Sequence, residues 1–225
     1  MPSTPRSSTN TRPDPVMRSN TSPRTKQERR DLAEQSLLEA ARRLVARRGV
    51  DQTSVADVGV AAGYSRGLVN HHFGSKKVLL RRAARESQRE IVEIVEGLTG
   101  NGLELLVAMV RSYLSWIDRK PDDARAFFAM WGAALPQESD LREVFADFDA
   151  GIRRTIEQFV RVGQGDGTIR TDAEPAGVAA AVTGMLRGTG AQLLVAPEGV
   201  AVEAACAVCE QFVRRSLAAP GTTAP

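Results

Sequence analysis

A short stretch at residues 65–72 carries the polar side chains whose types and spacing best suit chemistry on another molecule. Leu68, Val69 and Phe73 give this stretch one apolar side, so we expect its polar residues to face outward. A guanidinium fits the two acceptors of guanine in the major groove, an amide pairs with adenine, and Ser or His binds phosphate. The pattern predicts a short exposed helix that reads duplex DNA. Its outward candidates are Ser65, Arg66, Asn70 and His71.

Each of these residues also has a plain structural interpretation. Arg66 alone suits a solvated surface charge, Asn70 suits a turn or cap, and the pair His71-His72 suits a partly buried contact. A zinc site is not expected, because adjacent histidines point to different sides of a helix and no further ligands accompany them. Lys76 follows this stretch closely and is placed to bind a phosphate.

The elements that must position this stretch are helices with clear start and stop signals. Apolar residues recur at helical spacing from about residue 28 until Gly49, which supplies a stop. Ser54, with Asp57 three residues later, has capping-box spacing, and the helix it starts ends near Gly63. Ser65 and Ser75 are further N-cap candidates, for a short helix to about residue 72 and a long one at 76–96. The sequence therefore predicts a helix-turn-helix at about residues 53–72.

The rear half is expected to be helical throughout, since no strand-like alternation of any length occurs in it. A glycine cluster at residues 163–167 predicts the end of a helix. Because the cluster follows a helix and not a strand, it does not fit a nucleotide-binding loop. Cys206 and Cys209 lack a second pair of zinc ligands and fit two small apolar residues one helical turn apart. The predicted fold class is all-α. Rear helices are expected at residues 103–118, 122–135, 140–162, 175–195 and 200–217.

Charge divides the chain into two unlike parts. Residues 1–80 hold 14 basic and 7 acidic residues, a balance of +7, whereas residues 81–225 hold 16 and 20, a balance of −4. A basic front joined to a mildly acidic rear predicts that only the front meets a polyanion. Hydrophobic residues make up 42% and charged residues 25%, which excludes a largely disordered or disulfide-scaffold chain.

Both ends of the chain are expected to lack packed structure. Residues 1–26 combine Pro, Ser, Thr, Asn and Arg with too few apolar residues to offset ordering entropy, which predicts a disordered basic arm. Residues 218–225 predict a flexible tail. Neither a secretory leader nor an apolar run of about 18 residues is found. The sequence therefore predicts a cytoplasmic protein without a membrane partner.

A long series of residues in a fixed order extends through the helices predicted between residues 28 and 96. It reads Leu37-x3-Ala41-x2-Leu44-x4-Gly49, then Thr53-Ser54-Val55-x2-Val58-x3-Ala62-Gly63-Tyr64-Ser65-Arg66-Gly67-Leu68-Val69, then His72-Phe73-x-Ser75-Lys76-x2-Leu79. This run resembles the DNA-binding domain of the TetR family of transcriptional regulators. The resemblance implies a three-helix helix-turn-helix domain at residues 27–90 and a larger helical ligand-binding and dimerisation domain at residues 91–217. It also implies a homodimeric repressor that a small-molecule effector releases from a palindromic double-stranded DNA operator.

In that family the short third helix enters the major groove, so the resemblance assigns roles residue by residue. One departure is Asn70, which stands where the family usually has Tyr. An aromatic ring normally makes the contact at this position, whereas the amide of Asn70 can instead bind a base edge. The implied groove-facing residues are Ser65, Arg66, Gly67, Asn70 and His71. The implied phosphate-binding residues are Thr53, Ser54, His72 and Lys76.

The rear half resembles, more weakly, the C-terminal domain of BetI-like members of the family. The resemblance implies that the last two helices pair with those of a second copy, and the Ala and Gly residues at 175–195 allow such close packing. It also implies a ligand cavity with aromatic walls, although these side chains equally suit a plain helical core. The candidates are Tyr113, Trp116, Phe127, Phe128, Trp131, Phe145 and Phe148.

Two other classes of function stay open from the sequence. One is an enzyme that uses a helical cavity, and the other is a protein-interaction module that binds DNA only non-specifically. The chain offers no paired-carboxylate or His-centred set outside residues 65–72, no phosphate loop and no metal set. No catalytic residue, cofactor or metal is therefore expected, and the identity of the effector does not follow from the sequence.

Overall fold

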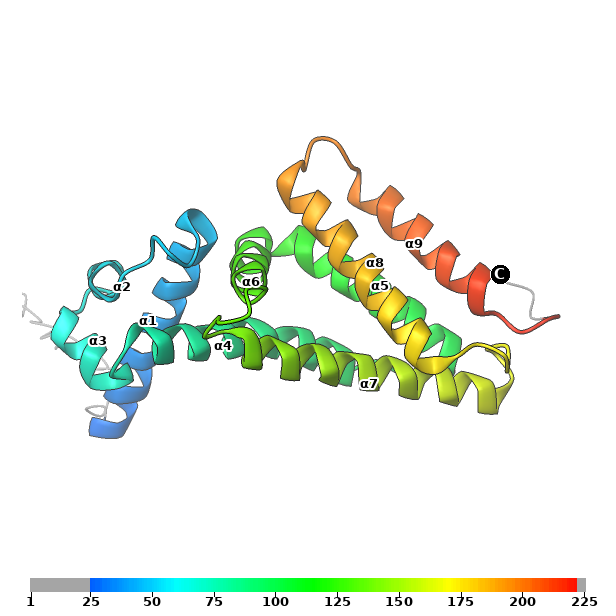
Figure 1. Ribbon diagram of the computed structural model, residues 1–225, viewed down its shortest axis with the longest axis horizontal. Helices are drawn as coiled ribbons and strands as arrows, with labels where there is room; N and C mark the ends of the chain where they lie inside the picture. The colour runs from blue at the N-terminus through cyan, green and yellow to red at the C-terminus, as the bar shows by residue number, and fades with distance from the viewer. Residues whose placement is uncertain (1–24, 222–225) are drawn as a thin grey trace, which may run out of the picture.

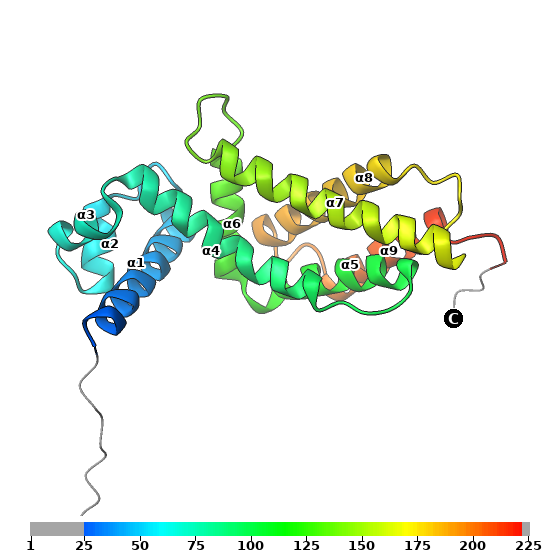
Figure 2. The same cartoon turned by 90° about the horizontal axis from the view of Figure 1, so that it is seen from below.

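The protein, seen in a computed structural model, is an elongated assembly of helices whose described part spans residues 25–221 (Figure 1). A small helical head lies at one end, a long helix leads out of it, and the remaining helices form a larger bundle (Figures 1 and 2). The all-α prediction is confirmed. The helices are α1 (Lys26–Arg48), α2 (Val55–Ala62), α3 (Arg66–Phe73), α4 (Lys76–Glu96), α5 (Gly102–Arg119), α6 (Pro121–Ala133), α7 (Arg142–Asp166), α8 (Pro175–Val195) and α9 (Val202–Leu217).

Helix α1 begins slightly earlier than its apolar pattern predicts. The Thr25 hydroxyl accepts a hydrogen bond from the Glu28 backbone at 3.1 Å, and the Thr25 N–H donates to the Glu28 carboxylate at 2.8 Å. This capping box satisfies two amide groups that would otherwise lack partners at the helix start. The last two residues of the predicted arm at 1–26 are therefore the N-cap and the first residue of α1, and residues 1–24 lie outside the described residues.

Helix α4 joins the head to the bundle. It packs on α1 near its start and on α5 and α7 farther along. Leu79 and Ala83 are buried in its first half, and Ile91 and Val95 in its second. Helix α6 also packs against α1, so the bundle supports the head directly as well as through α4.

Helix α7 continues through residues 163–166, where the glycine cluster predicted a break. Gly163 lies against Gly102 at the start of α5, and a Cβ atom on Gly102 would overlap the Gly163 backbone nitrogen. A Cβ atom on Gly163 would lie 2.5 Å from the Ile169 side chain. The prediction was wrong because these glycines serve close helix packing, and the turn comes only at Gly167, where φ is 78°.

The predicted tail at residues 218–225 is tied down at its beginning. Ala218 pairs with Ile169 in an isolated antiparallel bridge, and the Ala219 N–H donates to the Thr168 carbonyl at 3.0 Å. These bonds fasten the end of α9 to the segment after α7. Residues 222–225 lie outside the described residues.

Helix α8 is long and apolar enough to cross a membrane by length and composition alone. Only 28% of its most apolar 18-residue stretch is buried within one chain. The helix packs on α7, α5 and α9, so it is a bundle helix that leaves much of its apolar surface uncovered.

Candidate nucleic-acid interface

The corner between α2 and α3 is formed by local hydrogen bonds that the sequence pattern predicts. The Ser54 hydroxyl accepts from the Asp57 N–H at 3.1 Å, and the Ser54 N–H donates to the Asp57 carboxylate at 3.3 Å. Hydrogen bonds from the Ser54 hydroxyl and backbone hold the pKa of Asp57 below its usual value. At the other end of α2, Gly63 adopts the left-handed conformation with φ 75° and ψ 25°, which a sharp turn requires.

Close approach of α2 and α3 depends on Gly59, a residue that the sequence analysis did not single out. A Cβ atom at this position would lie 2.9 Å from the Tyr64 carbonyl oxygen and 3.2 Å from Val69 Cγ2. By contrast, Ala61 is exposed and Ala62 is only half-buried. The contact that sets the helix crossing therefore lies at Gly59, one turn before Gly63 at the end of α2.

Helix α3 presents its polar residues to solvent. Ser65 caps it by accepting from the Leu68 N–H at 3.2 Å, while Val69 and Phe73 are buried and hold the helix on the head. The Cβ position of Gly67 has open space except for the Ser65 hydroxyl at 3.7 Å. All five predicted groove-facing residues are exposed: Ser65, Arg66, Gly67, Asn70 and His71.

The four predicted phosphate-binding residues fall in different environments. Ser54 is exposed, and its hydroxyl also donates to Asp57 at 2.7 Å. His72 is half-buried, and Lys76 is half-buried with its ammonium group donating to the Asp51 carbonyl at 3.1 Å. Thr53 is 1% exposed, and its hydroxyl donates to the Gly49 carbonyl at 2.8 Å, so this side chain closes the turn after α1.

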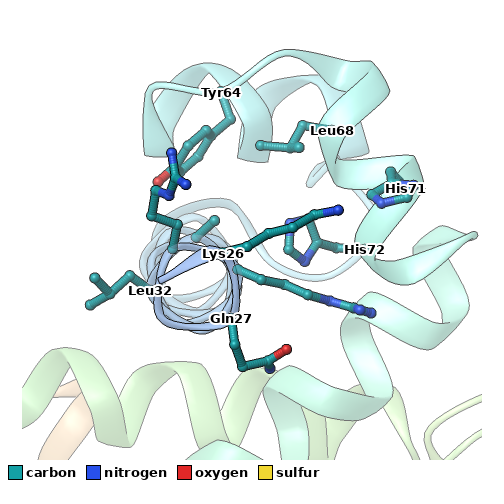
Figure 3. A pocket seen from close by; sticks show the side chains of 10 residues that line it. Lys26, Gln27, Leu32, Tyr64, Leu68, His71 and His72 are labelled. Carbon is teal, nitrogen blue, oxygen red and sulfur yellow. The ribbon is translucent and has the colours of Figure 1, made fainter. Parts of the chain in front are cut away.

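A groove of about 1060 Å³ runs beside α3, between it and the first turns of α1 (Figure 3). Figure 3 shows Leu68, His71 and His72 on one wall and the start of α1 on the other. The α1 wall carries a set of basic side chains that the sequence analysis did not assign to this site. They are Lys26, Arg29 and Arg30.

These α1 cations crowd the positive end of a helix dipole, where basic residues are unfavourable unless an anion lies nearby. Arg29 and Arg30 are exposed, and neither has an ion-pair partner within residues 25–221. Arg66 on α3 is likewise without an acidic partner in the described chain. A cluster of basic residues in the first two turns of a helix was the available sequence signal, and a phosphate backbone is the anion that fits it.

The predicted aromatic cluster lies together in the bundle, mostly as packed core. Trp116 and Phe127 are 1% and 0% exposed, and Phe127 has ring contacts at 5.5 Å to Phe145 and 5.7 Å to Phe148. Phe128 and Trp131 are half-buried, with ring centres 6.4 Å apart. Of the cluster, Tyr113 and Phe148 line a small internal cavity, and Phe148 also lines a groove between α4 and α7.

Cys206 and Cys209 are free thiols, half-buried and buried respectively. Burial, with the neighbouring Glu210 carboxylate, raises the pKa of Cys206 to about 11, so the thiol is protonated at neutral pH. No group of three or more His, Cys, Asp or Glu residues suited to a metal ion occurs in the described part of the chain.

Comparison with known proteins agrees with this geometry. A family described as "BetI-type transcriptional repressor, C-terminal" matches residues 102–218, and one described as "Bacterial regulatory proteins, tetR family" matches residues 37–83. The HTH-type transcriptional repressor AcnR of Corynebacterium glutamicum is 41% identical over 69 residues, which are 31% of this chain and 35% of that repressor. AcnR of Corynebacterium jeikeium is 30% identical over 154 residues, which are 64% of this chain and 73% of that repressor.

The fold also matches solved structures. A transcriptional regulator from Saccharomonospora viridis, in complex with choline, has a TM-score of 0.74 at 24% identity and covers 84% of this chain and 98% of that one. The first family match covers more than half of the 225 residues, and the second coincides with the exposed helix-turn-helix. The chain therefore belongs to the TetR family, and it is a DNA-binding transcriptional repressor, not an enzyme, with a BetI-type C-terminal domain.

Proposed function

We propose that two copies of this chain bind a near-palindromic operator and that a small-molecule effector releases them. The observation that carries the proposal is the outward side of α3, where Arg66, Asn70 and His71 are exposed while Val69 and Phe73 are buried. Two such helices related by a two-fold axis read successive major grooves about 34 Å apart. A dimer of this kind selects a palindromic site because its own symmetry is two-fold.

Contacts to the operator follow from the exposure of each side chain. Arg66 suits guanine and Asn70 suits adenine, whereas the basic α1 residues line the opposite wall of the groove beside α3 and suit the phosphate backbone. Thr53 is omitted because its side chain is buried. The proposed base-reading residues are Ser65, Arg66, Gly67, Asn70 and His71. The proposed phosphate-binding residues are Ser54, His72, Lys76, Lys26, Arg29 and Arg30.

The uncovered side of α8 and α9 supports dimerisation. Phe212 is 60% exposed on α9, and Met185 on α8 borders the same groove, which measures about 490 Å³. Helix α8 leaves most of its apolar length unburied in one chain, and a second copy of α8 and α9 would cover it. Large apolar surfaces of this kind are typical of obligate dimers.

Release by an effector requires little energy. A 100-fold loss of operator affinity corresponds to about 2.7 kcal/mol of differential effector binding between two arrangements of the dimer. Helix α4 is the element through which a change in the bundle reaches the head, since it packs on α1 as well as on α5 and α7.

Selection of bound fragments from genomic DNA tests the proposal. A specific repressor is expected to enrich near-palindromic sites and to hold them against roughly 10³-fold excess of unrelated duplex. For the dimer, Phe212→Asp is expected to give a monomer in sedimentation experiments. Its matched control is Leu135→Asp, since Leu135 is 63% exposed but lies after α6, away from the proposed interface. Enrichment of unrelated sequences, or dimers with Phe212→Asp, would count against the proposal.

A further inference from the structure

Aromatic rings in the bundle enclose one of the chain's own cations. The guanidinium carbon of Arg187 lies 4.4 Å from the ring centre of Phe127 and 5.6 Å from the ring centres of Trp131 and Phe148. Arg187 is only 9% exposed, so its charge lies inside the bundle. Rings around a positive charge form the aromatic cage in which proteins bind quaternary ammonium compounds. In this chain the cage exists, but Arg187 of α8 already occupies it.

Two hydrogen bonds hold the guanidinium in the cage. One terminal nitrogen donates to the Asp149 carboxylate at 2.7 Å, and the other donates to the Tyr113 hydroxyl at 3.2 Å. Burial raises the pKa of Tyr113 above its usual value, so the phenol stays neutral beside the guanidinium. Asp149 also accepts from the Trp131 indole at 3.2 Å, which fixes the carboxylate. A second cation entering this cage would meet an occupied space, and the Asp149 carboxylate is already paired with Arg187.

The remaining edge of the guanidinium is unused. Within residues 25–221, the buried Nε atom of Arg187 has no hydrogen-bond partner, and the buried hydroxyl of Thr183, one turn earlier on α8, has none either. Both residues line an internal cavity of about 20 Å³, which Phe148 and Ile152 also line. A buried charged donor without an acceptor is costly, so this cavity favours a group that brings acceptor oxygens.

A larger groove shares the wall formed by Phe148 and Ile152. It measures about 690 Å³ and lies between α4 and α7, which leave the head end side by side in the same direction (Figures 1 and 2). Gln88 on α4 lines it, is 7% exposed, and has an amide nitrogen without a partner in the described chain. Toward the far end the apolar residues Val95, Leu98 and Phe159 line it beside Glu96. The charged lining residues are Arg85, Arg89, Glu96 and Asp147, so the groove itself has no net charge.

Resting on the proposed function, we propose that Arg187 sets the charge of the effector that this repressor accepts. Arg187 takes the place of a cationic ligand in the cage and turns its free Nε edge toward a carboxylate. The effector enters the α4–α7 groove, keeps its apolar body there, and reaches Arg187 and Thr183 when Phe148 and Ile152 rotate aside. The effector class is an amphipathic monocarboxylate, and quaternary ammonium compounds are excluded.

Three probes with one alkyl chain and different head groups test this proposal: octanoate, octanol and octyltrimethylammonium. Binding to the full chain without DNA is measured by calorimetry and by tryptophan fluorescence, to which Trp116 and Trp131 contribute and in which the Trp131 ring lies 5.6 Å from the Arg187 guanidinium carbon. Octanoate is expected to bind about 10- to 100-fold more tightly than octanol, the gain of one hydrogen bond to a charged group. Octyltrimethylammonium is expected not to bind. Equal binding of octanoate and octyltrimethylammonium would overturn the proposal.

Two variants locate the contact. Arg187→Met is expected to weaken octanoate binding about 10- to 100-fold and to admit octyltrimethylammonium into the emptied cage beside Asp149. Thr183→Val removes only the unpartnered hydroxyl and is expected to weaken octanoate binding about 3- to 10-fold without loss of thermal stability. Thr189→Val on the same helix is the matched control and should leave octanoate binding unchanged.

Octanoate binding that neither Arg187→Met nor Thr183→Val weakens would overturn the proposed site, and if Arg187→Met does not fold, Thr183→Val alone decides. Operator binding without any probe is measured on the same preparation. Its absence would overturn the proposed function while the calorimetry still decides the ligand class. Octanoate binding without operator release would confirm the ligand class and contradict effector release.

Discussion

The head and the bundle use arginine in opposite ways. In the head, Arg66, Arg29 and Arg30 extend into solvent and have no acidic partner within residues 25–221. In the bundle, Arg187 is enclosed by rings and paired with Asp149 at 2.7 Å. The same side chain is thus a free charge available to a polyanion in one region and part of the packed interior in the other. From this difference we expect DNA affinity and fold stability to depend on separate sets of residues.

Phe127→Ala gives the largest expected effect and tests the bundle side of this comparison. The ring is 0% exposed and contacts Phe145, Phe148 and the Arg187 guanidinium. Its removal is expected to lower the free energy of unfolding by about 3–5 kcal/mol, measured by urea denaturation. Arg66→Ala, the head counterpart, is expected to change it by less than about 0.5 kcal/mol. Equal losses for the two variants would break the comparison.

Arg66→Ala tests the head side. Loss of a guanidinium that reads a guanine is expected to cost about 1–3 kcal/mol of specific binding and leave most non-specific binding intact. Fluorescence anisotropy on a selected operator measures the change. Arg43→Ala on α1 is the matched control, because Arg43 is exposed but paired with Glu39. Unchanged discrimination between operator and unrelated duplex would remove Arg66 from the base-reading set.

A pair of glycine substitutions separates packing of the corner from exposure of α3. Gly59→Ala places a methyl group 2.9 Å from the Tyr64 carbonyl oxygen and is expected to destabilise the head by about 1–3 kcal/mol. Gly67→Ala faces open space on an exposed helix and is expected to stabilise it by about 0.5–1 kcal/mol while impairing operator binding. Thermal unfolding and anisotropy measure the two effects. A stable, fully folded Gly59→Ala protein would show that the corner tolerates a wider spacing.

Arg30→Ala sharpens the comparison at the first turns of α1. If Arg30 binds a phosphate, the slope of log affinity against log salt is expected to become shallower by about one unit, with little change in sequence preference. Binding isotherms at several salt concentrations give the slope. The same slope as wild type would exclude this contact and confine the interface to α3 and its neighbours.

The smallest expected effect concerns the α2 capping box. The pKa of Asp57 is lowered in the folded state, so its ionised form adds stability above the usual value of 3.8, and this is lost as the pH falls through the folded-state pKa. Asp57→Asn is therefore expected to lower the thermal midpoint slightly at pH 7. The difference from wild type should shrink progressively below pH 3.8. A difference independent of pH would assign the effect to shape instead of charge.

The sequence predicted the elements whose signals are local. Ser54 with Asp57, Ser65 and Ser75 each mark a helix start that the structure contains. It misplaced the end of α7, because a glycine packed against another helix looks the same in sequence as a glycine in a turn. The groove beside α3 and the enclosure of Arg187 could not be predicted, because each is formed by segments that lie far apart in the sequence.

Helix α4 runs without interruption for 21 residues, which at about 1.5 Å per residue makes a rod roughly 30 Å long. A rotation of about 10° at one end of such a rod displaces the other by about 5 Å, close to half the width of a major groove of about 12 Å. For the proposed effector release, no large rearrangement is then needed to lose register on DNA. We expect the stiffness of this single helix, more than the strength of any one contact, to set how faithfully a small event in the bundle reaches the head.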